Sequence, residues 1–197
     1  PSMLLLMLDD EDIGKHDYSS LGSLMYGTAP MPADGIRKLA TFFKQARLTN
    51  IYGLTEGGGA RCSLSPSEAI ERPGSIGKPA KGVGLKVMTE SGEEAKPNEL
   101  GEIHMWSDSR RSYFKNEEAT ENTWTADGWL KTGDMGYVDA DGYLYLAGRN
   151  KDMIIRGGFN VYPVEIEDVL HEHPSVLEAA VVGVPHKILG EDVKAFI

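Results

Sequence analysis

The chain has 197 residues, of which 41% are hydrophobic and 25% are charged, a balance that is ordinary for a globular protein and sufficient for a core without disulfides. Its formal net charge of −10 argues against a nonspecific nucleic-acid-binding surface. The single cysteine, Cys62, excludes an internal disulfide framework and a cysteine-based zinc cluster, and it favours a reducing, cytoplasmic location. No apolar run reaches the roughly 18 residues that a membrane-spanning helix needs.

Both ends of the sequence are typical of cuts within a longer polypeptide. The chain begins with Pro1 and not with methionine, and it ends at Ile197 within a predicted strand. The apolar opening "PSMLLLML" lacks the basic start and the small-residue cleavage site of a signal peptide. We therefore expect these residues to be a piece of a longer protein.

The N-terminal part of the chain predicts a strand–helix–strand unit. Segment 34–46 places Ile36, Leu39, Ala40 and Phe43 at helical spacing after the turn-forming "PADG". The apolar "LGSLM" precedes this helix, and "LTNIYGLTEGGG" after it predicts a strand that ends in a glycine-rich loop. This order is typical of an α/β layer with ligand-binding loops at its strand ends.

The region from about 73 to 147 predicts a β-rich, barrel-like subdomain. In "GEIHMW", Ile103 and Met105 alternate with the other side chains as in a half-buried strand, and "DADG" joins "GYVD" to "GYLYLAG" as a strong hairpin signal. The segment "GSIGKP" lacks the spacing and the Ser or Thr of a Walker phosphate loop, so we interpret it as a turn that enters a strand. Taken alone, Asp134 in "KTGDMG" is most simply a turn former.

The last stretch predicts part of a small α+β domain. The segment "YPVEIEDVLHEHP" favours a helix, because Pro163 can occupy its first turn and Glu165 suits its positive end. The segments "VLEAAVVGVP" and "DVKAFI" predict two strands that pair with each other. Ahead of the helix, "GRNKDMIIRGG" has two interpretations: a linker with solvated charges, or, because of Gly157 and Gly158, a backbone that closely approaches another group.

Four motifs occur in the order "YGTAP", "YGLTE", "GWLKTGD" and "GRNKDMIIRGGFNVYPVEIE" and extend over nearly the whole chain. Together they resemble the adenylate-forming superfamily of acyl-CoA synthetases, adenylation domains and luciferases. The resemblance implies that a carboxylic acid is activated with ATP to an acyl-adenylate, and that a thiol, usually that of coenzyme A, then takes the acyl group while AMP leaves. It also implies that 1–147 is the C-terminal portion of a large domain, 148–151 a hinge, and 152–197 an incomplete small C-terminal domain.

The resemblance further implies a role for individual motif residues. Tyr52 would lie against the adenine ring, and Gly53 would let the acyl substrate and the nucleotide approach the backbone. Thr55 would hydrogen-bond a phosphate oxygen, Glu56 would hold Mg²⁺, and Asp134 would accept both ribose hydroxyls. The remaining implied residues are the adenine loop of Gly27, Thr28, Ala29 and Pro30, the ribose or phosphate contact Arg149, the hinge residue Lys151, and the pantetheine-tunnel residues Gly157 and Gly158.

Two parts of the family pattern are absent from the sequence. One is the Gly-, Ser- and Thr-rich phosphate loop upstream of "YGTAP", and the other is the lysine near the family's C terminus that stabilises the adenylation transition state. We therefore expect this polypeptide alone to be inactive or nearly so. The run "IIRGGFNVYPVEIE" is more similar to fatty- or aryl-acyl-CoA ligases than to peptide-synthetase adenylation domains.

Other functions compete with that of an acyl-CoA ligase. An adenylation domain that loads a carrier protein is the close alternative, and luciferase-type oxidation fits the same motifs. A noncatalytic nucleotide-binding or interaction module is the alternative outside enzymes, whereas an NAD-dependent oxidoreductase is disfavoured because the chain has no G-x-G-x-x-G strand–turn–helix unit. The expected partners are a small carboxylic acid and coenzyme A, with no nucleic acid and no integral membrane segment; the sequence does not indicate an oligomeric state.

Overall fold

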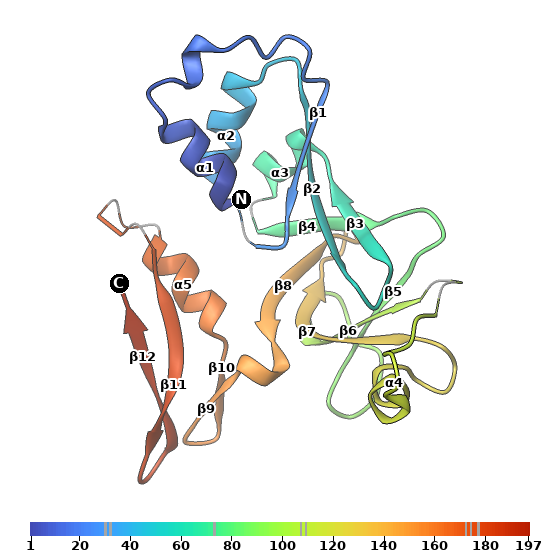
Figure 1. The fold of residues 1–197 in the computed structure, drawn as a ribbon. Coiled ribbons are helices and arrows are strands. Elements are labelled where there is room, and N and C mark those ends of the chain that lie inside the picture. Colours follow the sequence, from blue (N-terminus) through green and yellow to red (C-terminus); the bar gives the residue numbers. More distant parts are fainter. Residues whose placement is uncertain are drawn as a thin grey trace.

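A computed structural model describes residues 1–29, 31, 33–72, 74–106, 108, 110–171, 173, 175–176 and 178–197, and of residue 33 only the backbone. Two β-sheets organise this part of the chain, one of eight strands and one of four (Figure 1). Three helices lie near the N-terminal strands of the larger sheet, and one helix accompanies the smaller sheet (Figure 1).

Helices and strands both occur along the whole described part of the chain. The helices and 3₁₀ turns are α1 (Ser2–Asp9), η1 (Ile13–Lys15), α2 (Ala33–Phe42), α3 (Pro66–Glu71), α4 (Glu117–Thr123), η2 (Asn150–Asp152) and α5 (Pro163–His171). The strands of the larger sheet are β1 (Ser23–Gly27), β2 (Arg47–Leu54), β3 (Gly59–Leu64), β4 (Ser75–Pro79), β5 (Gly84–Met88), β6 (Gly101–Trp106), β7 (Leu130–Val138) and β8 (Leu144–Arg149). Those of the smaller sheet are β9 (Ile154–Arg156), β10 (Phe159–Val161), β11 (Ala180–His186) and β12 (Gly190–Phe196). Within the described ranges, no helix is both long and apolar enough to cross a membrane.

The larger sheet combines one parallel pair with a run of antiparallel pairs. The strands β1 and β2 are parallel and α2 connects them, which confirms the predicted strand–helix–strand unit. The other neighbours in the order β1-β2-β3-β4-β8-β7-β6-β5 are antiparallel, which confirms the predicted β-rich middle region. This order is open, with β1 and β5 at the two edges, so the subdomain expected to be barrel-like is the antiparallel end of a continuous sheet.

The first hydrophobic core lies beneath α2. The side chains of Ile36, Leu39 and Phe43 are each at most 4% exposed, and they pack in one cluster with Leu48 of β2 and Leu64 of β3. The apolar face that was predicted from helical spacing is therefore the face that covers the sheet.

A second core fills the antiparallel half of the sheet. Ile103 and Met105 of β6 are at most 2% exposed, as their alternation predicts. His104, on the opposite face of the same strand, is also buried at 7% exposure. The burial follows from its central position, since Lys86 of β5 and Lys131 of β7 are paired with it from the two sides. The alternating pattern thus predicted the burial of Ile103 and Met105 correctly, but it did not predict that His104 on the other face of β6 is buried too.

The interpretation of Asp134 as a turn former is wrong. Asp134 lies within β7 and pairs with Arg149 of β8. The preceding Gly133 has a φ of +72°, and the register of the pair shifts between Met135 and Gly136. A glycine and a bulge therefore let one strand continue through a segment whose composition is typical of a turn.

Only the start of the segment before α5 lies between the two sheets, as the linker interpretation expects, and the rest of it is a hairpin. The strands β9 and β10 form a hairpin in which Arg156 pairs with Phe159. The two residues between them, Gly157 and Gly158, have φ values of +60° and +87°. A two-residue hairpin turn with positive φ at both positions favours glycine, so the turn itself accounts for the glycine pair.

The smaller sheet and its helix agree with the predicted pattern. Helix α5 begins at Pro163, and β11 and β12 pair antiparallel. Tyr162, which is 5% exposed, packs with Met135 and Ala147 of the larger sheet, so one buried ring joins the two sheets. The chain passes from one sheet to the other between Arg149 and Ile154; the division into two domains with a hinge at 148–151 stays a prediction.

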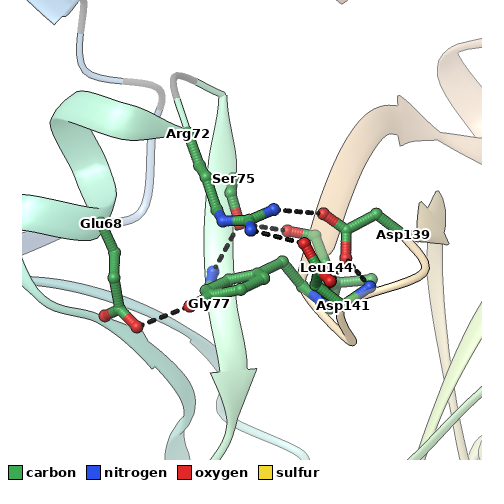
Figure 2. Close-up of polar contacts among 8 residues, drawn as sticks. Glu68, Arg72, Ser75, Gly77, Asp139, Asp141 and Leu144 are labelled. Carbon is green, nitrogen blue, oxygen red and sulfur yellow. Dashed lines mark hydrogen bonds and ion pairs between the residues drawn. The ribbon is translucent and has the colours of Figure 1, made fainter.

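A polar network fastens α3 to the turn of the β7–β8 hairpin (Figure 2). The Arg72 guanidinium donates to Asp139 at 2.8 Å and to Asp141 at 2.6 Å, and it lies 4.1 Å from the centroid of the Tyr143 ring. The Tyr143 hydroxyl donates to Glu68 of α3 at 2.7 Å. The hairpin that carries Asp134 and Arg149 is thereby tied to the N-terminal part of the sheet.

We expect Glu68→Gln to lower the thermal unfolding midpoint at pH 7 and to have less effect in acid. Hydrogen bonds, first from Ser65 and then from Tyr143, lower the pKa of Glu68 from its ordinary 4.5 to about 2. Because the folded-state pKa lies below the unfolded-state value, this stabilisation is complete above about pH 4.5 and is lost as the pH falls towards 2.

Calorimetry of the complete protein at about pH 7 and pH 3.5 tests this expectation. The difference between wild type and variant should be smaller at the lower pH. The matched control is Glu71→Gln, an exposed change on the same helix, which should leave the midpoint unchanged at both values. A difference for Glu68→Gln that stays constant with pH would contradict the expectation.

Candidate active site

The carboxyl ends of β1 and β2 meet at one edge of the larger sheet. Because the pair is parallel and Gly27 lies opposite Ile51, the loop that follows β1 starts beside the last residues of β2. In that loop Thr28 has a φ of +67°, a left-handed conformation that is uncommon for a residue with a side chain. Ala29 follows in the same loop, whereas Pro30 lies outside the described residues. The sheet thus brings the loop predicted to contact adenine next to the "YGLTE" motif.

Two glycines at this edge allow close contact between strands. A Cβ atom on Gly27 would lie 2.1 Å from the carbonyl oxygen of Ile51, and one on Gly53 would lie 2.0 Å from that of Gly59. Gly53 stands where the register of β2 and β3 shifts. Strand packing therefore already requires glycine at both positions, independently of any ligand.

Tyr52 and Asp134 come from motifs that are 82 positions apart and meet in the interior. The Tyr52 hydroxyl donates to Oδ2 of Asp134 at 2.5 Å, and each residue is 9% exposed. Burial, reinforced by the charge of Asp134, raises the pKa of the Tyr52 hydroxyl, so the group stays protonated and able to donate at neutral pH. The Tyr52 ring packs in the same cluster as Cys62 and Ile103.

Arg149 approaches the second oxygen of the same carboxylate. Its Nε atom lies 3.3 Å from Oδ1 of Asp134, and the side chain of Arg149 is 60% exposed while that of Asp134 is 12% exposed. The backbone of Asp134 is also held, because its N–H donates to the Thr132 hydroxyl at 3.1 Å and that hydroxyl donates to the Ile103 carbonyl at 2.7 Å. Asp134 is consequently held at its backbone N–H and contacted at both carboxylate oxygens.

Glu56 lies in the turn between β2 and β3 and has a partner that sequence reasoning missed. The Tyr113 hydroxyl donates to Oε1 of Glu56 across 57 positions. This hydrogen bond is the main cause that lowers the pKa of Glu56, and the positive charge of Arg149 acts in the same direction. Tyr113 sits in the loop before α4, next to Phe114 and otherwise among polar residues, and this composition gave no signal of its role. Glu56 is therefore an ionised carboxylate in the same neighbourhood as Arg149.

A cavity of about 320 Å³ opens beside Glu56. Its polar lining comes from β6, β7 and the segment around α4, and the full set is Leu54, Glu56, Glu102, Tyr113, Asn122, Thr123, Lys131, Thr132 and Gly133. Thr55, which the resemblance places on a phosphate, is exposed next to this cavity, in the same turn as Glu56.

Glu102 supports the strand that carries Asp134. Its Oε1 atom accepts from the Gly133 N–H at 3.2 Å, and its Oε2 atom lies 3.5 Å from Nε2 of His104. The interaction with His104 is the main cause that lowers the pKa of Glu102, and the Gly133 N–H adds to it. Glu102 therefore stays ionised and secures the peptide just before Asp134.

The remaining predicted residues lie further along the chain. Lys151 is exposed in η2, between the two sheets. Gly157 and Gly158 lie in the hairpin turn of the smaller sheet, where the Gly157 N–H donates to the Leu189 carbonyl at 2.9 Å. In the described part of the chain, no hydrogen bond or ion pair joins these glycines to Asp134.

The donor set near Glu56 is compatible with a magnesium ion that also binds phosphate. Among the described residues, no group of three or more His, Cys, Asp or Glu side chains is placed to hold a metal by itself. Magnesium in nucleotide sites commonly uses only one or two protein carboxylates together with substrate phosphates. The Tyr113 hydrogen bond engages Oε1 of Glu56, which leaves Oε2 as an oxygen ligand.

Comparison with known families and structures identifies similar proteins along the whole chain. The family model described as AMP-binding enzyme matches residues 1–110, and the model described as AMP-binding enzyme C-terminal domain matches residues 165–197. The fatty acid–[acyl-carrier-protein] ligase ScoC of Streptomyces coeruleorubidus is 38% identical over 100% of this chain and 38% of its own length.

Solved structures give the same result. The amide bond synthetase McbA of Marinactinospora thermotolerans superimposes with a TM-score of 0.89 at 33% identity, over 99% of this chain and 40% of that protein. The o-succinylbenzoate CoA synthetase MenE of Bacillus subtilis, in complex with its acyl-adenylate intermediate, superimposes with a TM-score of 0.85 at 35% identity, over 98% of this chain and 39% of that protein. MenE is also known in complex with ATP and a magnesium ion. The chain thus spans about two fifths of the length of these relatives.

We expect Tyr113→Phe to raise the pKa of Glu56 towards its ordinary value of 4.5, because the variant removes the main cause of the lowered pKa. The measurement is a carbon-13 NMR titration of the complete protein labelled at its glutamate carboxyl groups, with the Glu56 signal assigned by its loss in Glu56→Gln.

Tyr137→Phe is the matched control for this titration, since it removes a hydroxyl from a tyrosine that stacks on Tyr145 in the β7–β8 hairpin. The pKa of Glu56 should not change in that variant. The same pKa in wild type and Tyr113→Phe would show that the hydrogen bond does not govern the charge of Glu56.

Proposed function

Because this chain belongs to the family of AMP-binding enzymes, we propose that the complete protein is an ATP-dependent acid–thiol ligase. It activates a fatty or aryl carboxylic acid with ATP to an acyl-adenylate and pyrophosphate, and it then transfers the acyl group to coenzyme A with release of AMP. The observation that carries this proposal is the Tyr52–Asp134–Arg149 group beside Glu56 at the loop edge of the larger sheet. The 197 residues alone lack most of the length of the relatives, so the activity is proposed for the complete protein.

Asp134 binds the ribose in this proposal. A carboxylate offers two acceptor oxygens, which match the two hydroxyls of a vicinal diol. The adenine lies along the loop of Gly27, Thr28 and Ala29, whose start is paired with the end of β2. Arg149 contacts the ribose or a phosphate, since its guanidinium is both next to Asp134 and largely exposed.

Glu56 and Thr55 handle the phosphates. Attack of a carboxylate on the α-phosphorus brings two anions together, so positive charge and hydrogen-bond donors must offset their repulsion. Magnesium, held by Glu56, supplies that charge when it is bound. The Thr55 hydroxyl is exposed in the same turn and donates to a phosphate oxygen.

For the second half-reaction, the thiol must reach the acyl-adenylate, and we propose that a movement of the smaller sheet gives it access. Lys151 lies in the short turn between the two sheets, where a change of backbone angle rotates the smaller sheet relative to the larger one. Gly157 and Gly158 then border the path of the pantetheine arm. Cys62, a free and buried cysteine, is consistent with a protein located in a reducing compartment such as the cytoplasm.

A carrier protein is the alternative acyl acceptor, and the similarity to ScoC, named as a ligase for an acyl carrier protein, favours that alternative specifically. The acceptors share a phosphopantetheine thiol, so the residues described above do not distinguish them. Incubation of the complete protein with ATP, a panel of carboxylic acids and either coenzyme A or a phosphopantetheinyl carrier protein separates the two functions. A protein that binds AMP but forms no thioester with either acceptor would be the noncatalytic nucleotide-binding module.

We expect Glu56→Gln in the complete protein to reduce magnesium-dependent ATP–pyrophosphate exchange roughly 10²-fold, the scale for removing one group that stabilises developing charge. Acyl transfer to coenzyme A from a preformed acyl-adenylate should change far less, because no pyrophosphate takes part in that step. Glu118→Gln, an exposed change on α4, is the control. Equal losses in both half-reactions would remove the magnesium role from Glu56.

Lys151→Pro should spare adenylate formation and abolish most thioester formation, because proline fixes φ at the proposed hinge. The matched control is Lys151→Ala, which removes the same side chain but leaves the backbone angle free. Rapid-quench measurement of the two half-reactions distinguishes them. Normal overall turnover in Lys151→Pro would exclude a hinge at this position.

A further inference from the structure

The Tyr52 hydroxyl has a task separate from the predicted contact of the ring with adenine. The residue is 9% exposed, and its ring is covered by the core cluster that contains Cys62, Ile103 and Leu144. Its hydroxyl lies 2.5 Å from Oδ2 of Asp134. We infer that Tyr52 is a positioning residue for Asp134, so that its hydroxyl sets the orientation in which the carboxylate receives the two ribose hydroxyls. This inference rests on the ribose contact of the proposed function.

Counting hydrogen-bond acceptors supports this role. Each carboxylate oxygen can accept about two hydrogen bonds. Tyr52 occupies one acceptor site on Oδ2 of Asp134, and Arg149 lies against Oδ1. One acceptor site then stays available on each oxygen, which is the arrangement that a vicinal diol requires. Both supporting groups are hydrogen-bond donors, so neither of them uses the remaining acceptor sites of the carboxylate.

Of these two groups, Tyr52 provides the rigid one. The Arg149 side chain is 60% exposed, so solvent competes with its contact to Asp134. The Tyr52 hydroxyl is held by a ring packed in the core, and burial together with the charge of Asp134 raises its pKa and keeps its proton in place. Because Thr132 fixes the backbone of Asp134, the freedom left to the residue is rotation of its carboxylate, which is the motion that the Tyr52 bond restrains.

The inference is tested by nucleotide binding to the complete protein, measured by calorimetry with AMP and with 2′,3′-dideoxy-AMP. Tyr52→Phe removes one oxygen and keeps the ring. We expect AMP to bind about 10-fold more weakly to this variant, near the lower end for a hydrogen bond to a charged group, because Tyr52 acts through Asp134. The dideoxy nucleotide, which has no ribose hydroxyls to present, should bind within about twofold of wild type.

Two further variants complete the test. Asp134→Asn should remove the preference for AMP over the dideoxy nucleotide. The preference of the wild type relative to this variant is then the part of the affinity that depends on the Asp134 carboxylate. Tyr143→Phe is the matched control, since it also deletes a hydroxyl that donates to a carboxylate, that of Glu68, and it should leave both affinities unchanged. A loss in Tyr52→Phe that is equal for the two nucleotides would show a purely structural role and overturn the inference, as would no loss for either.

Failure of the inference and failure of the proposed function have different signatures. If wild type prefers AMP and Tyr52→Phe keeps that preference, the inference fails while the ligase proposal is untouched. If Tyr52→Phe loses the preference but the wild-type protein forms no thioester, the inference stands and the proposed reaction fails. A wild-type protein that binds both nucleotides equally would overturn the ribose contact and the inference together.

Discussion

The register between β7 and β8 is the constraint on which the candidate site depends. It sets Asp134 opposite Arg149, and the same hairpin receives Arg72 at its turn and leads through η2 into the smaller sheet. Because side chains alternate between the two faces of a strand, a slip of one residue would turn Asp134 away from Tyr52. The proposed ribose contact, the attachment to the N-terminal strands and the route to the second sheet therefore all rely on one strand pairing. The polar network around Arg72 stabilises that pairing at its far end.

Three carboxylates of the candidate site each accept a hydrogen bond from an uncharged donor. Asp134 has the Tyr52 hydroxyl, Glu56 has the Tyr113 hydroxyl, and Glu102 has the Gly133 N–H, while Arg149 is the cation near the first two. Lys131 also lines the cavity beside Glu56, so the side chains around this cavity carry both signs of charge. In the proposed reaction, a divalent cation would add positive charge next to the phosphates.

The sequence predicted local elements well and contacts between distant motifs poorly. Helical spacing identified the buried face of α2, and "DADG" identified the β7–β8 hairpin, because each signal lies within a few consecutive residues. The segment around Asp134 misled because Gly-Asp usually favours a turn, and only pairing with β8 makes it a strand. The hairpin around the glycine pair before α5 was not predicted, because its strands β9 and β10 have only three residues each and are too short to show a periodic pattern.

Candidate site residues could be named from the sequence only where a motif resembled that of a known family. Glu56 and Asp134 were named from their motifs, but Tyr113 and the bond from Tyr52 to Asp134 were not, because they join positions 57 and 82 apart. No local pattern encodes such a contact; it follows from the order of strands in the folded sheet. The ribose, phosphate, hinge and pantetheine roles of the individual residues stay predictions.

The glycines at the edge of the sheet have a consequence for how such a site can diversify. A Cβ atom at Gly27 or Gly53 would overlap a carbonyl oxygen of the neighbouring strand, so neither position can acquire a side chain without moving the sheet. If these two positions were randomised and the proposed ligase were selected for activity on a different carboxylic acid, we expect glycine to be kept at both positions. In the proposed ligase, a change of acyl specificity must therefore come from side chains on other segments, while the backbone of this edge stays the same.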